Sequence, residues 1–300
     1  MNGTGRAWQA RGQVRSLCGW DIFTVDVPPA GTEEQAPLLV LHGFPTSSFD
    51  FHRVVDRLAA HRRVLAFDML GYGLSDKPDR GYSMGIQADV AAAFLSALGL
   101  DRVGLLTHDV GDTVGGELLA RTLDGEWSVE ITDRALTNGS IYVELARLSA
   151  GQRLLLDLPD QRLPDEALLG EEDVMAGVAA TFSPATVPDP VELACQWALM
   201  THQNGQQLLP RLIRYIEERR RSESRFTGAI ERHPSPLTVV WGLDDPIAVP
   251  AMVDRLVAAR PDCAVSRLAG VGHYPMIEAP DRFLEALGDG RGTGARPPAA

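Results

Sequence analysis

The sequence predicts an α/β fold in which a mostly parallel, doubly wound sheet carries an inserted helical cap. Through residue 138, short apolar runs typical of buried parallel strands alternate with amphipathic helical stretches. From 139 to 233 helical stretches continue without a run of strand character, and the strand pattern returns at 237. We therefore expect a sheet core formed by 1–138 and 234–287, with a cap at 139–233 between them. Residues 288–300, mostly Gly, Pro, Arg and Ala, are predicted to be a disordered tail.

Each element follows from a local pattern. Two runs of strand character flank Cys18-Gly19-Trp20 and predict an N-terminal hairpin. The predicted strands are apolar or β-branched runs bounded by turn residues: 13–17, 21–27, 37–41, 63–67, 102–106, 131–137, 237–241 and 264–268. The predicted helices share helical spacing of apolar residues: 51–58, 83–98, 112–123, 250–259 and 280–287 in the core, and 141–148, 171–180, 191–200 and 206–221 in the cap.

The composition of the chain limits the kinds of molecule that it is expected to bind. The chain has 300 residues, 45% of them hydrophobic, which is enough for a substantial core. Its 28 Lys and Arg against 40 Asp and Glu give a net charge of -12, which disfavours nucleic acid or an anionic membrane surface as the main partner. Cys18, Cys195 and Cys263 are scattered and indicate neither a disulfide framework nor a zinc site. With no signal-peptide pattern and no long apolar span, we expect a cytoplasmic protein.

The candidate nucleophile is Asp109, in Thr107-His108-Asp109-Val110-Gly111. A strand turns sharply into a helix there, with a small residue two before Asp109 and a Gly two after it, the pattern of a nucleophile elbow. The pKa of a free Asp carboxyl is near ~3.9, so this group is anionic at neutral pH and suits attack on an electrophilic sp³ carbon. Two other interpretations are a capped helix start and a metal site that includes Asp112.

Asp245 and His273 follow Asp109 in the chain order nucleophile, acid, histidine, each just after a predicted strand. A catalytic His needs an acceptor for its second ring nitrogen, and a carboxylate can fill that role. Asp244 is an alternative acid. Structural roles for these residues, a turn before Pro246 and a surface histidine, remain open at this point.

A candidate oxyanion loop, His42-Gly43-Phe44-Pro45, follows the strand at 37–41. Its position predicts that the backbone N–H groups of Phe44 and Val110 face the negative charge that develops during the reaction. Taken alone, the same residues are equally typical of a simple turn.

Four motifs resemble the epoxide hydrolase and haloalkane dehalogenase branch of the α/β-hydrolases, and within it the mesoderm-specific transcript proteins. The motifs are His42-Gly43-Phe44-Pro45-Thr46-Ser47-Ser48, the loop from Asp68 to Pro78, His108-Asp109-Val110-Gly111-Asp112, and Gly272-His273-Tyr274-Pro275. The resemblance spans about 20–287 and includes Leu136-Thr137-Asn138-Gly139 and Tyr215-Ile216-Glu217-Glu218-Arg219. It implies an α/β-hydrolase fold with a helical cap, no cofactor and no metal, and a covalent alkyl-enzyme ester on the Asp.

The positions at which this chain differs from the proteins of that branch affect which substrate is expected. Dehalogenases commonly hold the leaving halide with a Trp after the nucleophile, whereas this chain has Val110 there. Epoxide hydrolases protonate the leaving oxygen with cap tyrosines, and Tyr215 and Tyr142 lie in the predicted cap, Tyr215 within a stretch that carries the resemblance. Either tyrosine is also compatible with ordinary packing.

The sequence thus favours an epoxide hydrolase-like enzyme acting on a small apolar electrophile and water. The alternatives are a haloalkane dehalogenase, a carboxylic-ester hydrolase, or a binding protein that uses the fold without catalysis. The sequence sets no oligomeric state, and a homo-oligomer is one option.

Overall fold

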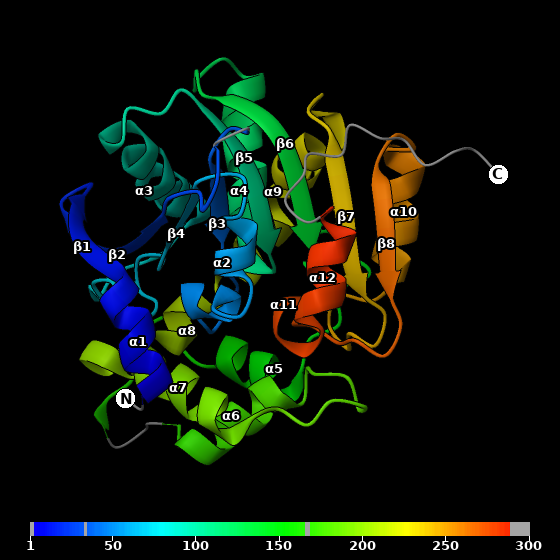
Figure 1. Ribbon diagram of the computed structural model, residues 1–300. Coiled ribbons are helices and arrows are strands. Elements are labelled where there is room, and N and C mark those ends of the chain that lie inside the picture. Colours follow the sequence, from blue (N-terminus) through cyan, green and yellow to red (C-terminus); the bar gives the residue numbers. More distant parts are fainter. Residues whose placement is uncertain (1–2, 33–34, 166–168, 289–300) are drawn as a thin grey trace.

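The computed structural model describes residues 3–32, 35–165 and 169–288, and these form a sheet of eight strands with helices on both faces (Figure 1). The strand order is β1-β2-β4-β3-β5-β6-β7-β8. β2 is antiparallel to both β1 and β4, and all other neighbours are parallel, as predicted. The strands are β1 (Gly12–Leu17), β2 (Trp20–Val27), β3 (Leu38–Leu41), β4 (Val64–Phe67), β5 (Arg102–His108), β6 (Glu130–Thr137), β7 (Leu237–Gly242) and β8 (Ala264–Leu268).

The central strands are buried along their whole length. Every residue of β3, β4 and β7 is buried, because helices cover both faces of the sheet. In Figure 1, α2 (Val55–Leu58) and α12 (Pro280–Ala286) lie in front of the sheet, whereas α3 (Met84–Ala97) and α4 (Val110–Leu123) lie behind it. This two-sided cover explains why these strands are continuous apolar runs rather than alternating ones. The remaining core helices are α10 (Ala251–Ala259) and α11 (Pro275–Glu278).

The cap helices gather at one end of the sheet, in the lower part of Figure 1. They are α5 (Ala150–Asp157), α6 (Glu171–Ala179), α7 (Pro190–Met200) and α8 (Leu209–Leu212), with a 3₁₀ segment η3 (His202–Leu208) before α8. Helix α9 (Tyr215–Arg232) then returns to the core and packs along α4. Local caps set two of these boundaries: Ser149 and Gln152 form a capping box at α5, and the Asp189 side chain accepts a hydrogen bond from Val191 N–H at α7.

Several segments differ from the sequence prediction. The helix predicted at 206–221 is divided among η3, α8 and α9, and the helix predicted at 51–58 is a 3₁₀ turn (Ser48–Phe51) followed by α2. Gly3–Arg11 forms helix α1, which the sequence analysis did not predict. The helix predicted at 141–148 is wrong: Val143 N–H donates to Glu223 and Arg147 N–H to the carbonyl of Ile247, so tertiary partners replace helical ones. The tail predicted at 288–300 lies, apart from Gly288, outside the described residues.

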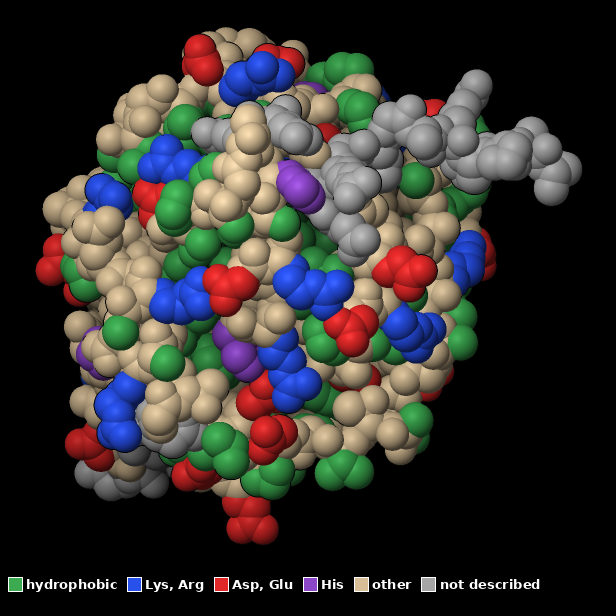
Figure 2. All heavy atoms as spheres, in the orientation of Figure 1, with side chains coloured by type: hydrophobic (Ala, Val, Ile, Leu, Met, Phe, Trp, Pro, Cys, Tyr) green, Lys and Arg blue, Asp and Glu red, His purple; other side chains and the backbone are tan. Residues whose placement is uncertain are grey.

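The surface mixes both signs of charge. On the face shown in Figure 2, basic and acidic side chains are interspersed. Surface ion pairs such as Arg267–Asp254 (2.7 Å) are consistent with this mixing. Among the described residues, no helix is both long and apolar enough to cross a membrane.

We predict that Leu39→Ala lowers the free energy of unfolding by about 2–5 kcal/mol, because it opens a cavity in a strand buried on both faces. Leu39 is 0% exposed, whereas Val14 on the edge strand is 57% exposed. Urea denaturation of Leu39→Ala and of the control Val14→Ala, expected to change stability by less than about 0.5 kcal/mol, measures the difference. Equal losses in the two variants would contradict this account of the core.

Candidate active site

Asp109 occupies the sharp turn between β5 and α4. Its backbone has φ 50° and ψ −109°, a sparsely populated conformation for a residue other than Gly. Close packing holds the turn against the end of β3: a Cβ on Gly111 would lie 2.2 Å from the carbonyl oxygen of Leu41. A Cβ on Gly43 would lie 2.9 Å from the Cβ of Asp109. Both glycines are therefore required for the loop and the turn to meet.

The carboxylate of Asp109 is buried and points to the loop that follows β3. The backbone N–H of Phe44 donates a hydrogen bond to Asp109 Oδ2 at 2.9 Å. Val110 is the first residue of α4, so its N–H belongs to the unpaired donors of a helix N-terminus. Asp109 itself makes no side-chain capping bond to α4, and the described residues contain no group of three or more potential metal ligands. The geometry therefore favours the elbow interpretation of this stretch.

His42 holds the oxyanion loop in place. Its Nδ1 lies 2.8 Å from the carbonyl oxygen of Gly43, and its Nε2 lies 3.0 Å from the backbone nitrogen of Met69, which can only donate. Nε2 is therefore the acceptor and Nδ1–H the donor. Burial lowers the pKa of His42, which keeps this neutral tautomer.

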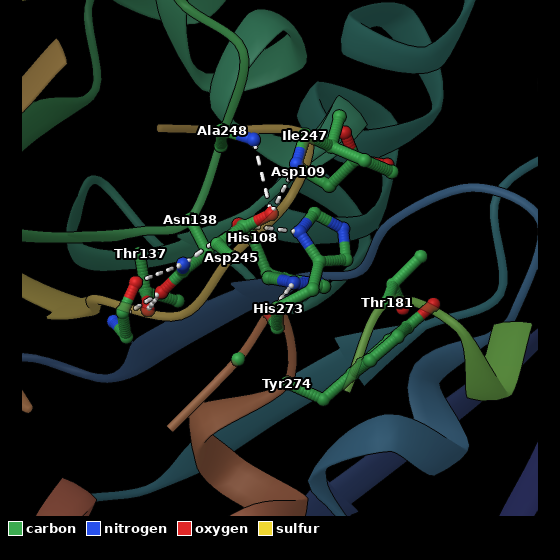
Figure 3. Close-up of polar contacts among 12 residues, drawn as sticks. His108, Asp109, Thr137, Asn138, Thr181, Asp245, Ile247, Ala248, His273 and Tyr274 are labelled. Carbon is green, nitrogen blue, oxygen red and sulfur yellow. Dashed lines mark hydrogen bonds and ion pairs between the residues drawn. The ribbon is translucent and has the colours of Figure 1, made fainter. Parts of the chain in front are cut away.

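His273 and Asp245 form a buried pair beside Asp109 (Figure 3). His273 Nδ1 lies 2.8 Å from Asp245 Oδ2, and the backbone N–H of His273 donates to the carbonyl of Thr181 in the cap. Burial lowers the pKa of His273, but the charges of Asp245, Asp109 and Glu278 outweigh burial and raise it to about 9. The charge on His273 is thus coupled to the charge on Asp109.

Asp245 is held by four donors, which Figure 3 shows converging on its carboxylate. Oδ1 accepts from the backbone N–H groups of Ile247 (2.7 Å) and Ala248 (3.0 Å), and Oδ2 accepts from Asn138 (2.8 Å) and His273. Asp244 is exposed and bonds instead to the hydroxyl of Ser183 at 2.6 Å. Of the two neighbouring acids, Asp245 is the one that contacts the histidine.

Two positioning residues were not identified from the sequence. Asn138 lies at the end of β6 with φ 46°, and its side-chain amide bonds both the N–H and the carbonyl of Gly242 as well as Asp245. His108 Nε2 lies 2.8 Å from the carbonyl oxygen of His273, and burial lowers the pKa of His108, so it is a neutral donor. The sequence could have pointed to both residues, because each lies at the carboxyl end of one of two adjacent parallel strands.

A cavity of about 770 Å³, including its open mouth, separates this cluster from the cap. The core contributes Phe44, Asp109, His273 and Tyr274 to its lining. The cap contributes mainly apolar side chains, among them Leu154 and Leu155 of α5, Val174 and Val178 of α6, and Leu209 of α8. Such a site fits a substrate that is largely apolar and has one polar reacting group.

Tyr215 lies close to this site and Tyr142 does not. Tyr215 begins α9, its ring lies 5.7 Å from that of Phe44, and its hydroxyl accepts a long 3.4 Å hydrogen bond from Gln152, which lines the cavity. Burial and the nearby Asp109 raise the pKa of Tyr215, so its hydroxyl stays protonated. The hydroxyl of Tyr142 instead donates to Glu231 at 2.8 Å. Neither tyrosine is among the described residues that line the cavity. The structure therefore does not bring Tyr142 to the site.

Tyr274 does line the cavity, although the sequence analysis gave it no role. It directly follows His273, and its ring packs edge-on against that of His273 with centroids 5.0 Å apart. Its place next to a candidate catalytic histidine was the signal that could have identified it.

Comparisons with known proteins agree with this architecture. The family model described as "Alpha/beta hydrolase family" matches residues 38–286. The chain is 38% identical to LipZ, a candidate hydrolase of Mycobacterium tuberculosis, over 94% of this chain and 96% of that one. It is 34% identical to the human mesoderm-specific transcript homolog protein, over 93% and 85%. A solved α/β-hydrolase fold protein from Burkholderia ambifaria superposes with a TM-score of 0.72 at 26% identity, over 92% and 96%.

The family match covers most of the sheet and the whole predicted cap, and the two relatives align over 96% and 85% of their own length. The fold and the chain order of Asp109, Asp245 and His273 fit the same assignment. The chain belongs to the α/β-hydrolase family.

Proposed function

We propose that this hydrolase opens epoxides through a covalent ester on Asp109. The observation that carries the proposal is the hydrogen bond from Phe44 N–H to Asp109 Oδ2. It holds one carboxylate oxygen in the oxyanion loop, whereas none of the described residues donates a hydrogen bond to Oδ1. Oδ1 is then the attacking atom, in a carboxylate that lines the apolar cavity.

In the first step, Asp109 Oδ1 forms a bond to an epoxide carbon while the ring carbon–oxygen bond breaks. The departing oxygen takes the electron pair and becomes strongly basic, so a proton donor is needed as the bond breaks. Tyr215 supports this role because it is buried, protonated and close to Asp109. The product of the step is a hydroxyalkyl ester of Asp109.

In the second step, His273 takes a proton from water, and the resulting hydroxide attacks the ester carbonyl. Esterification removes the negative charge of Asp109, which is one of the groups that raise the pKa of His273. The pKa of His273 therefore falls once the ester has formed, its proton passes to the phenolate that ring opening leaves on Tyr215, and the neutral ring is then the base that the second step needs. Oδ2, already next to Phe44 N–H, carries the charge of the tetrahedral intermediate.

The alternative chemistries find less support in the site. A halide leaves without a proton and needs N–H donors, but Val110 follows the nucleophile and no Trp is among the described residues that line the cavity. Attack of a carboxylate on an ester carbonyl would give an anhydride rather than a stable ester, so an Asp nucleophile is poorly suited to ester hydrolysis. A purely binding role would leave the buried Asp109, His273 and Asp245 cluster without a use.

We predict that His273→Gln forms the ester but cannot hydrolyse it. Incubated with an epoxide, this variant should gain the mass of one substrate molecule, because attack by Asp109 does not require the imidazole. Intact-mass measurement and peptide mapping to Asp109 check the adduct. Asp109→Ala is the control and should gain no mass and show no turnover. Steady diol production by His273→Gln without an adduct would contradict the two-step scheme.

We predict that Asp245→Asn lowers kcat far more than Asp244→Asn. Only Asp245 accepts the hydrogen bond from His273, and its loss favours the wrong tautomer; in a serine protease such a change costs about 10⁴-fold. Asp244 is a matched control in the same loop, with a partner in Ser183 rather than His273. Diol formation measured side by side ranks the two, and the opposite ranking would assign the acid role to Asp244.

We predict that Tyr215→Phe slows epoxide ring opening by about 10²- to 10⁴-fold, the usual effect of losing a general acid. Tyr142→Phe is the matched control, because the Tyr142 hydroxyl bonds to Glu231 outside the cavity. Single-turnover ester formation with a panel of alkyl and aryl epoxides measures the effect. Rapid halide release from haloalkanes, no reaction with epoxides and wild-type behaviour of Tyr215→Phe would together exclude the epoxide proposal.

A further inference from the structure

The side-chain amide of Gln152 has a fixed orientation, because its oxygen and its nitrogen each make a hydrogen bond. Gln152 is the third residue of α5, where it forms a capping box with Ser149. The backbone N–H of Ser149 donates to Gln152 Oε1 at 2.9 Å, and a backbone N–H can only donate. This bond identifies the amide oxygen, so Nε2 is the atom that contacts the hydroxyl of Tyr215.

The orientation of the amide sets the direction of its hydrogen bond to Tyr215. Nε2 of a glutamine can only donate, so the hydroxyl oxygen of Tyr215 is the acceptor. The hydroxyl proton of Tyr215 then points elsewhere, and none of the described residues accepts a hydrogen bond from it. Tyr215 is 2% exposed, and a buried donor without an acceptor is uncommon in folded proteins. The proton of Tyr215 is therefore available to a bound molecule.

Gln152 is shared by two cavities. It lines the cavity that contains Asp109 and His273, and together with Tyr215 it lines a smaller cavity of about 360 Å³, including its open mouth. The hydroxyl of Tyr215 is thus bonded to a residue in the wall of the main cavity. At 3.4 Å this bond is long, as the hydrogen bonds of catalytic groups often are before substrate binds, and it can shorten as negative charge develops on the phenol.

The groups around Tyr215 act on its acidity in both directions. Burial and the charge of Asp109 raise the pKa of Tyr215, whereas the charge of Arg219 and the hydrogen bond from Gln152 lower it. The guanidinium of Arg219 lies 5.0 Å from the centroid of the Tyr215 ring, and the buried Tyr72 also interacts electrostatically with Tyr215. The amide of Gln152 thus favours the phenolate that proton transfer leaves on Tyr215.

The capping box does not by itself require an amide at position 152. Glu and Gln are both typical of the third position of such a box, because either side chain accepts a hydrogen bond from the backbone N–H of the capping residue. An acidic side chain in the first turn would also favour the helix. A carboxylate, however, has no proton to donate to Tyr215 and would accept the proton of its hydroxyl. Of the two residue types, only Gln leaves the proton of Tyr215 free.

We propose that Gln152 is a positioning residue for the general acid, because its amide donates to Tyr215 and so keeps the hydroxyl proton free for the departing oxygen. The inference rests on the proposed epoxide chemistry. As Asp109 Oδ1 bonds to carbon and the ring carbon–oxygen bond breaks, the oxygen takes the proton of Tyr215. The hydrogen bond from Gln152 Nε2 then stabilises the phenolate until the proton of His273 restores the phenol.

The test measures ester formation on Asp109 in single turnovers with styrene oxide. Gln152→Glu keeps the capping box but reverses the bond to Tyr215, so it should slow ester formation by about 10²-fold, in the range of lost general acid catalysis. Gln152→Leu removes the bond without reversing it and should slow the step by about 2- to 10-fold, the effect of one lost hydrogen bond. Gln203→Glu is the matched control, because Gln203 is an exposed cap residue that lines neither cavity.

A double-mutant cycle with Tyr215→Phe separates positioning from a structural role. In the Tyr215→Phe background, Gln152→Glu and Gln152→Leu should cause no further loss, because the hydroxyl on which they act is absent. An effect on folding would persist in both backgrounds, and circular dichroism and thermal unfolding would record it. A loss that persists in the Tyr215→Phe background would overturn the positioning role.

The pH profile of Gln152→Glu gives a second readout. Its rate of ester formation relative to the wild type should rise as pH falls through the pKa of the introduced carboxyl, because the protonated carboxyl can again donate to Tyr215. Gln152→Leu should show no such rise. The other charged or titratable residues that line the two cavities with Gln152 are the same in every variant compared: Asp109, Asp173, His273, Arg219 and Arg220, besides Tyr215 itself.

The same measurements distinguish this inference from the proposed function. If Tyr215→Phe slows ester formation and Gln152→Glu does not, the inference is refuted and the epoxide chemistry stands. If Tyr215→Phe forms the ester as fast as the wild type, Tyr215 is not the donor and the inference is refuted with that role. If the wild type forms no ester with styrene oxide or with the wider epoxide panel, the proposed function itself fails.

Discussion

The site depends on the contact between the oxyanion loop and the nucleophile turn. Phe44 N–H reaches Asp109 Oδ2 at 2.9 Å only because Gly43 and Gly111 allow two backbone segments to approach closely. The backbone of Asp109 accepts an unfavourable positive φ in the same arrangement. A side chain at either glycine would push the loop and the turn apart, and the carboxylate would lose the donor that orients it.

The charge of Asp109 also affects His273, which connects the contact between the loop and the turn to the rest of the site. The carboxylates of Asp245 and Asp109 both favour the charged form of the buried His273 ring. Asn138 and two backbone N–H groups hold Asp245, so the carboxylate is stabilised without a lysine or arginine. In the proposed mechanism, this arrangement lets the chemistry on Asp109 itself change the basicity of His273.

The cap supplies most of the apolar side chains that line the cavity. The carboxyl ends of the strands collect polar groups at one edge, and α5 and α6 cover that edge with apolar side chains. The cap also places Gln196 on the buried carboxyl of Asp50 and the carbonyl of Thr181 on the backbone N–H of His273, so it contacts the core beside the site at two points. In the proposed mechanism, this cover excludes water from Asp109 while the substrate binds.

The sequence by itself determined the sheet, its order of elements and the chain positions of Asp109, Asp245 and His273. These depend on local rules, since buried parallel strands are apolar runs and reactive groups follow their carboxyl ends. Only the tertiary structure decided which neighbouring acid faces the histidine and that Tyr142 bonds to Glu231 away from the cavity. Those contacts join residues 28 and 89 positions apart, and side-chain direction across such separations is set by packing rather than by local pattern.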